Sequence, residues 1–175
     1  MSKCVFERYS SSSSTFVFLG DYVDCGAKSK ENIEFLFEKK RENPDRVYLL
    51  QGNHENYVNL LFYPADFWES LNKTEVEHYS SEMKKFPLVF SVGEIIALHG
   101  ALPDINEIEK INNVKVLDEN WRRILWGDFC ESESEFMYSS ETRPCFGKFY
   151  FDRIMAKLGK NVLIRSHQPD ADMRM

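Results

Sequence analysis

Two apolar runs in the N-terminal half of the chain end in glycine and are followed at once by polar side chains. The first reads FVFLGDYVDCG over Phe16–Gly26, and the second reads RVYLLQGNHE over Arg46–Glu55. A short apolar run bounded by turn residues is typical of a buried strand. Ligands of open α/β sheets bind beyond the carboxyl ends of the strands, so both loops are predicted to serve one site. The polar residues of these loops are Asp21, Asp24, Asn53, His54 and Glu55.

The segment between the two runs has helical periodicity. Ile33, Leu36 and Phe37 provide an apolar face at i, i+3 and i+4, and Asn43-Pro44-Asp45 ends the predicted helix, which spans about Ser29–Glu42. With strands before and after it, this helix completes a β-α-β crossover, which places its two strands in parallel.

The rest of the chain alternates helical and extended patterns. About thirty helical residues after GNHE predict a cap, and the apolar runs Pro87–Val92 and Glu94–Leu98 predict a hairpin that turns at Gly93. The remaining predicted elements are short helices near 105–111 and 118–125, an exposed loop over 130–144, a helix over 148–158 and a strand over 161–164.

Composition narrows the possible classes of protein. With 175 residues and 43% hydrophobic content, one domain with a sizeable core is expected, over residues 15–175, after a serine-rich leader at 1–14. The net charge of −6 argues against binding to nucleic acid or to anionic membranes. The apolar runs are shorter than the roughly 18 residues of a membrane span, and four cysteines without a CxxC pair suggest reduced thiols in a cytoplasmic protein.

Five short motifs, in order, resemble one known family. GDYVDCG and GNHE are followed by LHG at 98–100, WGD at 126–128 and RSHQ at 165–168. Together they resemble the phosphoprotein phosphatase family of serine/threonine protein phosphatases, within the calcineurin-like metallophosphoesterases. The resemblance implies an α/β fold of the metallophosphoesterase type: a β-sandwich of mixed sheets flanked by helices, here without the family's first strand-helix unit and last strands.

The resemblance also implies a two-metal hydrolase of phosphoproteins, with Mn, Fe or Zn as the divalent ions. His54, held by Asp24, is the implied proton donor to the leaving alcohol. Arg143 and Asn53 are the implied phosphate-binding residues, and Asp128 and Glu55 would order the site. The implied metal ligands are Asp21, Asn53, His99 and His167.

The sequence departs from the family pattern at several positions, which leaves other interpretations open. It has no GDxHG motif, so one metal site lacks expected ligands, and Cys25 and Gln51 stand where arginines are common in the family. A pseudophosphatase that binds phosphoproteins is one alternative, and a hydrolase of small phosphoesters or dinucleoside polyphosphates is another. Taken singly, each aspartate could be a turn residue and each histidine an ordinary half-buried side chain.

Overall fold

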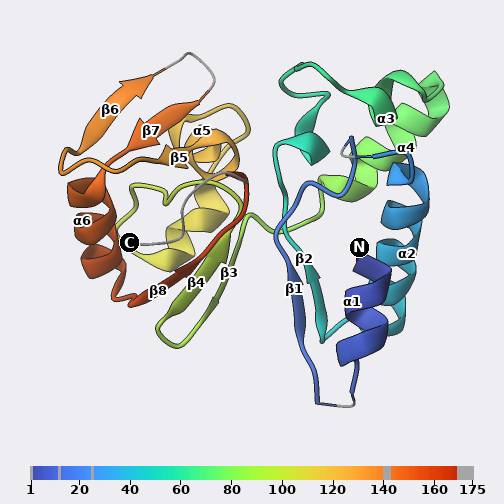
Figure 1. The fold of residues 1–175 in the computed structure, drawn as a ribbon, viewed down its shortest axis with the longest axis horizontal. Coiled ribbons are helices and arrows are strands. Elements are labelled where there is room, and N and C mark those ends of the chain that lie inside the picture. The colour runs from blue at the N-terminus through green and yellow to red at the C-terminus, as the bar shows by residue number, and fades with distance from the viewer. Residues whose placement is uncertain (1, 12, 25, 140–142, 169–175) are drawn as a thin grey trace. The chain divides into compact units, whose positions relative to one another are not determined.

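The structure of the chain is a computed structural model that describes residues 2–11, 13–24, 26–139 and 143–168. By its internal contacts the chain divides into two compact units, Met1–Pro87 and Leu88–Met175, and each is described by itself below (Figure 1). The assignment of 15–175 to one domain stays a prediction. Among the described residues, the helices are too short or too polar to cross a membrane.

The N-terminal unit is built on the predicted β-α-β crossover. Strand β1 (Phe16–Phe18) pairs in parallel with β2 (Val47–Leu49), and helix α2 (Ser29–Glu42) connects them. The helix has the predicted bounds, and its buried residues Ile33 and Leu36 pack into the core of this unit. The apolar periodicity of the sequence therefore determined this part of the fold, and the crossover prediction is confirmed.

Helix α1 (Ser2–Tyr9) differs from the predicted leader over 1–14. The ring of Phe6 lies 4.7 Å from the ring of Phe16 and 6.0 Å from that of Phe35. These aromatic contacts bury apolar surface of the segment and favour its packing. The prediction of a leader rested on the neighbouring serine run and overlooked Phe6.

The segment after GNHE is helical, as predicted. It contains the short 3₁₀ turn η1 (His54–Asn56), helix α3 (Asp66–Glu69) and helix α4 (Lys73–Met83). A capping box starts α4: the Asn72 side chain accepts from the Glu75 N–H, and the Glu75 carboxylate accepts from the Asn72 N–H. These helices pack into the core of the N-terminal unit through the buried side chains of Phe67, Trp68, Tyr79 and Met83.

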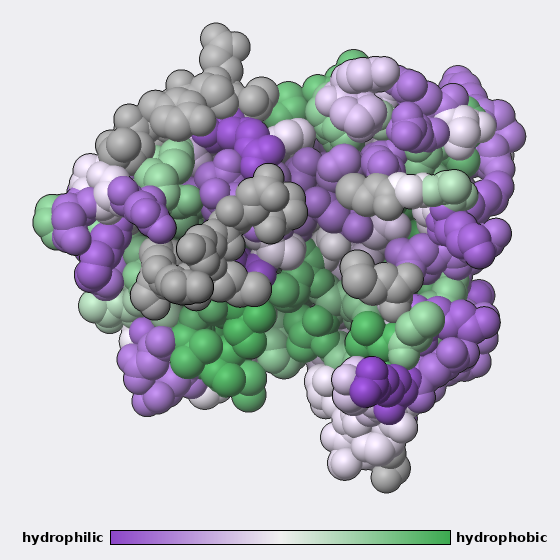
Figure 2. Space-filling model, in the orientation of Figure 1, coloured by the Kyte–Doolittle hydropathy of each residue, from purple (hydrophilic) through white to green (hydrophobic). Residues whose placement is uncertain are grey.

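The first sheet of the C-terminal unit contains the predicted hairpin. Strand β3 (Val89–Val92) pairs antiparallel with β4 (Ile95–Leu98), and β4 pairs in parallel with β8 (Val162–Ile164). Gly93 in the turn has φ of +52°, a conformation that favours glycine. Apolar residues gather over this part of the surface in Figure 2. Val92, Val162 and Ile164, on the strands of this sheet, have exposed side chains.

The second sheet of this unit corrects the prediction of an exposed loop over 130–144. Strand β7 (Pro144–Phe146) lies between β5 (Asp128–Phe129) and β6 (Phe136–Ser139), parallel to the first and antiparallel to the second. The acidic and serine residues on either side of Phe136–Ser139 hid β6, because the run FMYS is too short to stand out as a strand within them.

Three helical segments complete the C-terminal unit. Helix α6 (Lys148–Leu158) has its predicted bounds, α5 (Glu119–Trp126) is shifted by one residue, and the helix expected near 105–111 is a 3₁₀ segment, η2 (Ile108–Asn113). Gly159 ends α6 in the left-handed conformation with φ of +62°.

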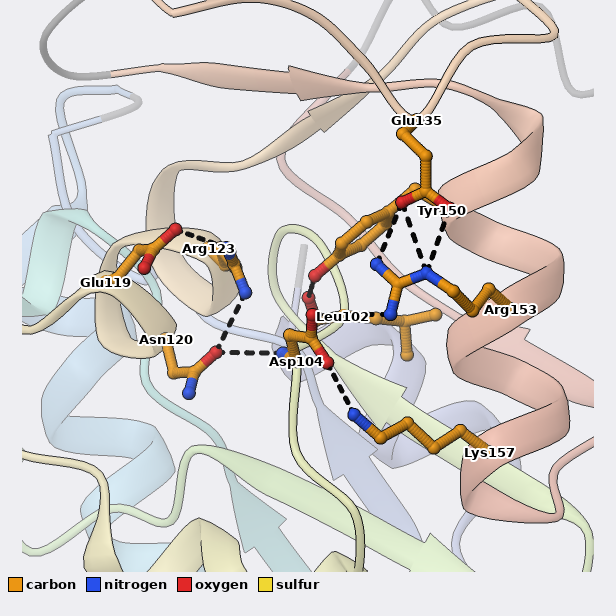
Figure 3. Close-up of polar contacts among 9 residues, drawn as sticks. All are labelled: Leu102, Asp104, Glu119, Asn120, Arg123, Glu135, Tyr150, Arg153 and Lys157. Atoms are coloured by element: carbon orange, nitrogen blue, oxygen red, sulfur yellow. Dashed lines mark hydrogen bonds and ion pairs between the residues drawn. The ribbon is translucent and has the colours of Figure 1, made fainter.

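Polar contacts fix α6 to the chain that follows β4 (Figure 3). The Asp104 carboxylate accepts from Lys157 at 2.7 Å and from Arg153 at 3.3 Å, and Arg153 also pairs with Glu135. The Tyr150 hydroxyl donates to the Leu102 carbonyl at 2.7 Å. The ion pairs are largely exposed and contribute little each, so they orient α6 rather than dominate its stability.

Leu36→Ala should lower the free energy of unfolding by about 2–5 kcal/mol, because Leu36 is fully buried and its truncation leaves a cavity in the core. Leu61→Ala is the matched control, since Leu61 is 72% exposed. Urea unfolding followed by circular dichroism measures both. Equal stability of the two variants would contradict the assigned core.

Candidate functional site

Glu55 holds the two predicted loops of the N-terminal unit together. Its Oε2 accepts from the backbone N–H of Asp21 and of Gly52, and its Oε1 accepts from that of Tyr22, each at 2.8 Å. Hydrogen bonds to a carboxylate are stronger than those between neutral groups, and Glu55 is only 3% exposed. The loop after β1 is thus tied to the loop after β2.

The close approach of the two loops explains why residue 52 is glycine and why the Tyr22 hydroxyl stays protonated. A Cβ on Gly52 would lie 2.5 Å from Oδ1 of Asp21, so only glycine fits there. Burial, then the charge of Glu55, raises the pKa of Tyr22 well above its usual value. The phenol therefore stays neutral and lies 2.8 Å from the Leu50 carbonyl, to which it donates.

His54 and Asp24 form the predicted pair. Nδ1 of His54 lies 2.9 Å from Oδ2 of Asp24, whose other oxygen accepts from the Phe67 N–H at 2.8 Å. Burial alone would lower the pKa of the His54 ring, but the hydrogen bond to Asp24 and the charges of Asp21 and Glu55 outweigh it and raise the pKa. The structure thus favours the imidazolium form of His54, which can donate a proton from Nε2.

Asp21 and Asn53 lie in the same pair of loops. Oδ1 of Asp21 accepts from the His54 N–H at 3.3 Å, and Asn53 is 4% exposed. The N-terminal unit therefore brings together the five residues that the sequence predicted there.

In the C-terminal unit, His99 at the end of β4 and His167 after β8 lie side by side. Nε2 of His99 is 3.1 Å from Nδ1 of His167, and Nδ1 of His99 is 2.9 Å from the Ser166 hydroxyl. Without a cation, one of the two facing ring nitrogens must carry the proton that they share. A divalent ion can take that place, because neutral imidazole nitrogens are ligands of Zn, Fe and Mn.

Asp128 at the start of β5 orders the surroundings of His167. Its carboxylate forms a two-pronged pair with Arg143, at 2.9 and 3.1 Å, and lies 3.7 Å from Nε2 of His167 and 3.8 Å from Arg165. The acid is thus beside both the predicted ligand His167 and the predicted phosphate-binding residue Arg143. At 3.7 Å the Asp128 carboxylate is beyond hydrogen-bond distance of Nε2, so it places negative charge beside the His167 ring without a direct hydrogen bond.

The backbone is strained at three of the predicted residues. Asp21, Asp24 and His167 have φ of +56°, +66° and +72°. Asp and His are among the few non-glycine residues that tolerate the left-handed region. Strain of this kind clusters at functional sites, so it supports the assignment of these residues to the site.

Sequence reasoning missed some neighbours of these residues. Ser166 and Arg165 belong to the RSHQ motif and could have been found from it, whereas Phe62, whose ring lies 4.6 Å from that of His54, carried no signal. His78 lies exposed on α4, as expected for a residue outside the motifs. Cys25 lies outside the described residues.

Glu55→Gln should lower the free energy of unfolding by about 2–3 kcal/mol, because the amide keeps the shape but loses the charge and turns a donor toward backbone N–H groups. Glu69→Gln, at an exposed position of α3, is the matched control and should be neutral. Chemical unfolding of both variants measures the difference. A neutral Glu55→Gln would refute the proposed clamp.

In metal-free protein, the His54 ring should titrate above the ordinary histidine pKa of about 6.5, because its pKa is raised in the fold. The associated stability is complete below about pH 6.5 and is lost as the pH rises through the folded pKa. Asp24→Asn should lower the pH midpoint of the His54 titration, because it removes the charge of Asp24. Asparagine also tolerates the positive φ of this position. The NMR signals of the His54 ring, assigned with the His54→Ala variant, measure this titration. An unchanged midpoint in Asp24→Asn would contradict the His54–Asp24 pair.

The chain is similar to known serine/threonine protein phosphatases. The chain is 33% identical over 187 residues to the serine/threonine-protein phosphatase 2B catalytic subunit A1 of Saccharomyces cerevisiae, covering 91% of this chain and 34% of that protein. It is 27% identical to the serine/threonine-protein phosphatase 4 catalytic subunit of Eremothecium gossypii, covering 87% of this chain and 53% of that protein. The chain thus spans between about a third and a half of these two relatives.

The fold matches a solved structure. A serine/threonine phosphatase from Saccharomyces cerevisiae superposes with a TM-score of 0.81 at 21% identity, over 95% of this chain and 56% of that one. This confirms the predicted mixed α/β fold with sheets flanked by helices. Residues 4–171 match the family described as calcineurin-like phosphoesterase. The chain therefore belongs to the calcineurin-like phosphoesterase family.

Proposed function

We propose that the protein is a metal-dependent phosphomonoester hydrolase that acts on phosphoserine and phosphothreonine in proteins. Membership of the phosphoesterase family and the names of the two relatives support the reaction and the substrate class. The observation that carries the proposal is the His54–Asp24 pair, 2.9 Å apart, because this contact raises the pKa of the ring and so favours its proton-donating form.

The proposed metal ligands are Asp21 and Asn53 from the N-terminal unit and His99 and His167 from the C-terminal unit. Asp21, His99 and His167 each offer a carboxylate oxygen or ring nitrogen of the kind that divalent metals bind. Bound divalent ions would supply hydroxide near neutral pH and neutralise charge on the phosphoryl oxygens. Mn, Fe and Zn all suit this mixture of oxygen and imidazole ligands.

His54 is the proposed proton donor to the departing serine or threonine oxygen. Asp24 orients the ring through Nδ1 and leaves Nε2 to donate, while the Phe62 ring packs at its edge. Positioned proton transfer of this kind contributes about 10²–10⁴-fold in rate. Glu55 acts through the backbone, since it fixes Asp21 and Gly52 relative to His54.

Arg143, together with the Asn53 amide, is the proposed phosphate-binding residue. A guanidinium has five N–H donors in one plane, and the pair with Asp128 uses Nε and one terminal nitrogen to set that plane. Planar guanidinium groups match the geometry of phosphate oxygens. The net charge of −6 fits a phosphoprotein substrate better than a nucleic acid or membrane partner. The scattered cysteines fit a cytoplasmic setting.

The test is hydrolysis of a phosphoserine peptide by the chain with added Mn²⁺. His54→Ala should lower kcat by about 10²–10⁴-fold, because the leaving oxygen then departs without a proton. His78→Ala is the matched control, as His78 is an exposed histidine of α4, and it should leave the rate unchanged. Equal rates for His54→Ala and the unsubstituted chain would refute the role of His54.

A second candidate is a non-catalytic phosphoprotein-binding module, which Cys25, at a position where the family commonly has an arginine, favours. Metal content distinguishes the two, because the enzyme needs ions that the binder does not. Elemental analysis after dialysis with Mn²⁺ should find one to two ions per chain for the enzyme, and His99→Ala should reduce that content. Phosphopeptide binding with neither metal nor turnover would support the binder.

A further inference from the structure

The strand register of the C-terminal unit brings two cysteines to one face of the second sheet. Cys145 on β7 is the register partner of Asp128, and Phe146 is the partner of Phe129. Cys130 follows Phe129 directly, so by the two-residue period of a strand its side chain lies on the same face as that of Cys145. The two thiols therefore belong to adjacent segments and the same surface of the sheet.

The backbone holds Cys130 in this place. Its N–H donates to the Phe146 carbonyl at 3.0 Å, and its Sγ lies 3.3 Å from the same carbonyl oxygen. Phe146 is the immediate neighbour of Cys145 along β7. The same register places Cys130 opposite Gly147, so the two cysteines are diagonal neighbours, and their side chains must span the distance that remains between the strands.

The two thiols differ in burial. Cys145 is 6% exposed, whereas Cys130 is half-buried, and both are free thiols. Burial, then the hydrogen bond with the Cys130 thiol, raises the pKa of Cys145 to about 12. Because thiolates are the nucleophiles, the raised pKa slows the reaction of Cys145 with an oxidant. The more exposed Cys130 is therefore the thiol that an oxidant reaches first.

We propose that Cys130 and Cys145 form an oxidisable dithiol that closes to an intramolecular disulfide in the presence of a peroxide. In the first step the Cys130 sulfur takes one peroxide oxygen, the O–O bond breaks, and water and a sulfenic acid result. In the second step the Cys145 sulfur attacks the Cys130 sulfur, the S–O bond breaks, and the second water leaves with the Cys145 proton. Two thiols and one peroxide thus give one disulfide and two waters, and a thiol reductant reverses the change.

This bond would link β5 to β7 next to a charged cluster. Asp128 is the register partner of Cys145, and its carboxylate holds Arg143, two residues before Cys145. The modification is independent of the proposed function, because it needs only the two thiols and an oxidant. It would make the end of β5 sensitive to the redox state of the surroundings.

Cleavage after glutamate tests the pairing in the unsubstituted chain, because it places each of the four cysteines in a different peptide. Cys130 falls in Asn120–Glu131 and Cys145 in Thr142–Met175, while Met1–Glu7 and Arg8–Glu31 carry the other two. After dilute protein is treated with hydrogen peroxide and remaining thiols are alkylated, mass spectrometry should find the first two peptides joined and lighter by two hydrogens. Dithiothreitol should separate them.

Cys130→Ser and Cys145→Ala should each abolish the joined peptide, whereas Cys4→Ser should not. A non-reducing gel should show the oxidised chain as a monomer, which separates the internal bond from a link between two chains. Alkylated Cys145 beside a sulfinic or sulfonic acid at Cys130 would overturn the proposal. Preferential linkage of Cys130 to either of the other two cysteine peptides would overturn it as well.

Discussion

The polar cluster of the N-terminal unit depends on one buried carboxylate. Glu55 accepts three backbone N–H groups, two from the loop after β1 and one from the loop after β2. Hairpin ladders or helices normally satisfy such donors, but here a side chain does so, at the place where both strands have ended. Asp21 and His54 consequently lie close together, and the hydrogen bond from the His54 N–H to the Asp21 carboxylate adds to this arrangement.

In both units an aspartate that is itself held by another group lies near a histidine ring. In the N-terminal unit, Asp24 lies 2.9 Å from His54, and in the C-terminal unit Asp128 lies 3.7 Å from His167. In each case the acid is itself anchored, Asp24 by the Phe67 N–H and Asp128 by Arg143. An anchored acid stays beside an imidazole at less entropic cost than a mobile one.

Much of the fold could be predicted from the sequence where apolar periodicity was strong. Helices α2 and α6 and the hairpin of β3 and β4 follow from it, because burial of one face sets their pattern. Strand β6 and helix α1 were not predicted, because acidic and serine residues surround the short run FMYS of the first, and a few aromatic contacts hold the second next to a serine run. The motifs named the polar residues of the site, but Phe62 and the Glu55 clamp required three-dimensional contacts.

The left-handed backbone at Asp21, Asp24 and His167 also limits how this protein can change. Most side chains at these positions would cost about 1–2 kcal/mol in backbone energy alone, before any loss of polar contact. Asparagine and glycine are the replacements that avoid that cost. Few residue types should therefore be tolerated at these positions, both in natural variants and in directed evolution, whatever reaction is selected.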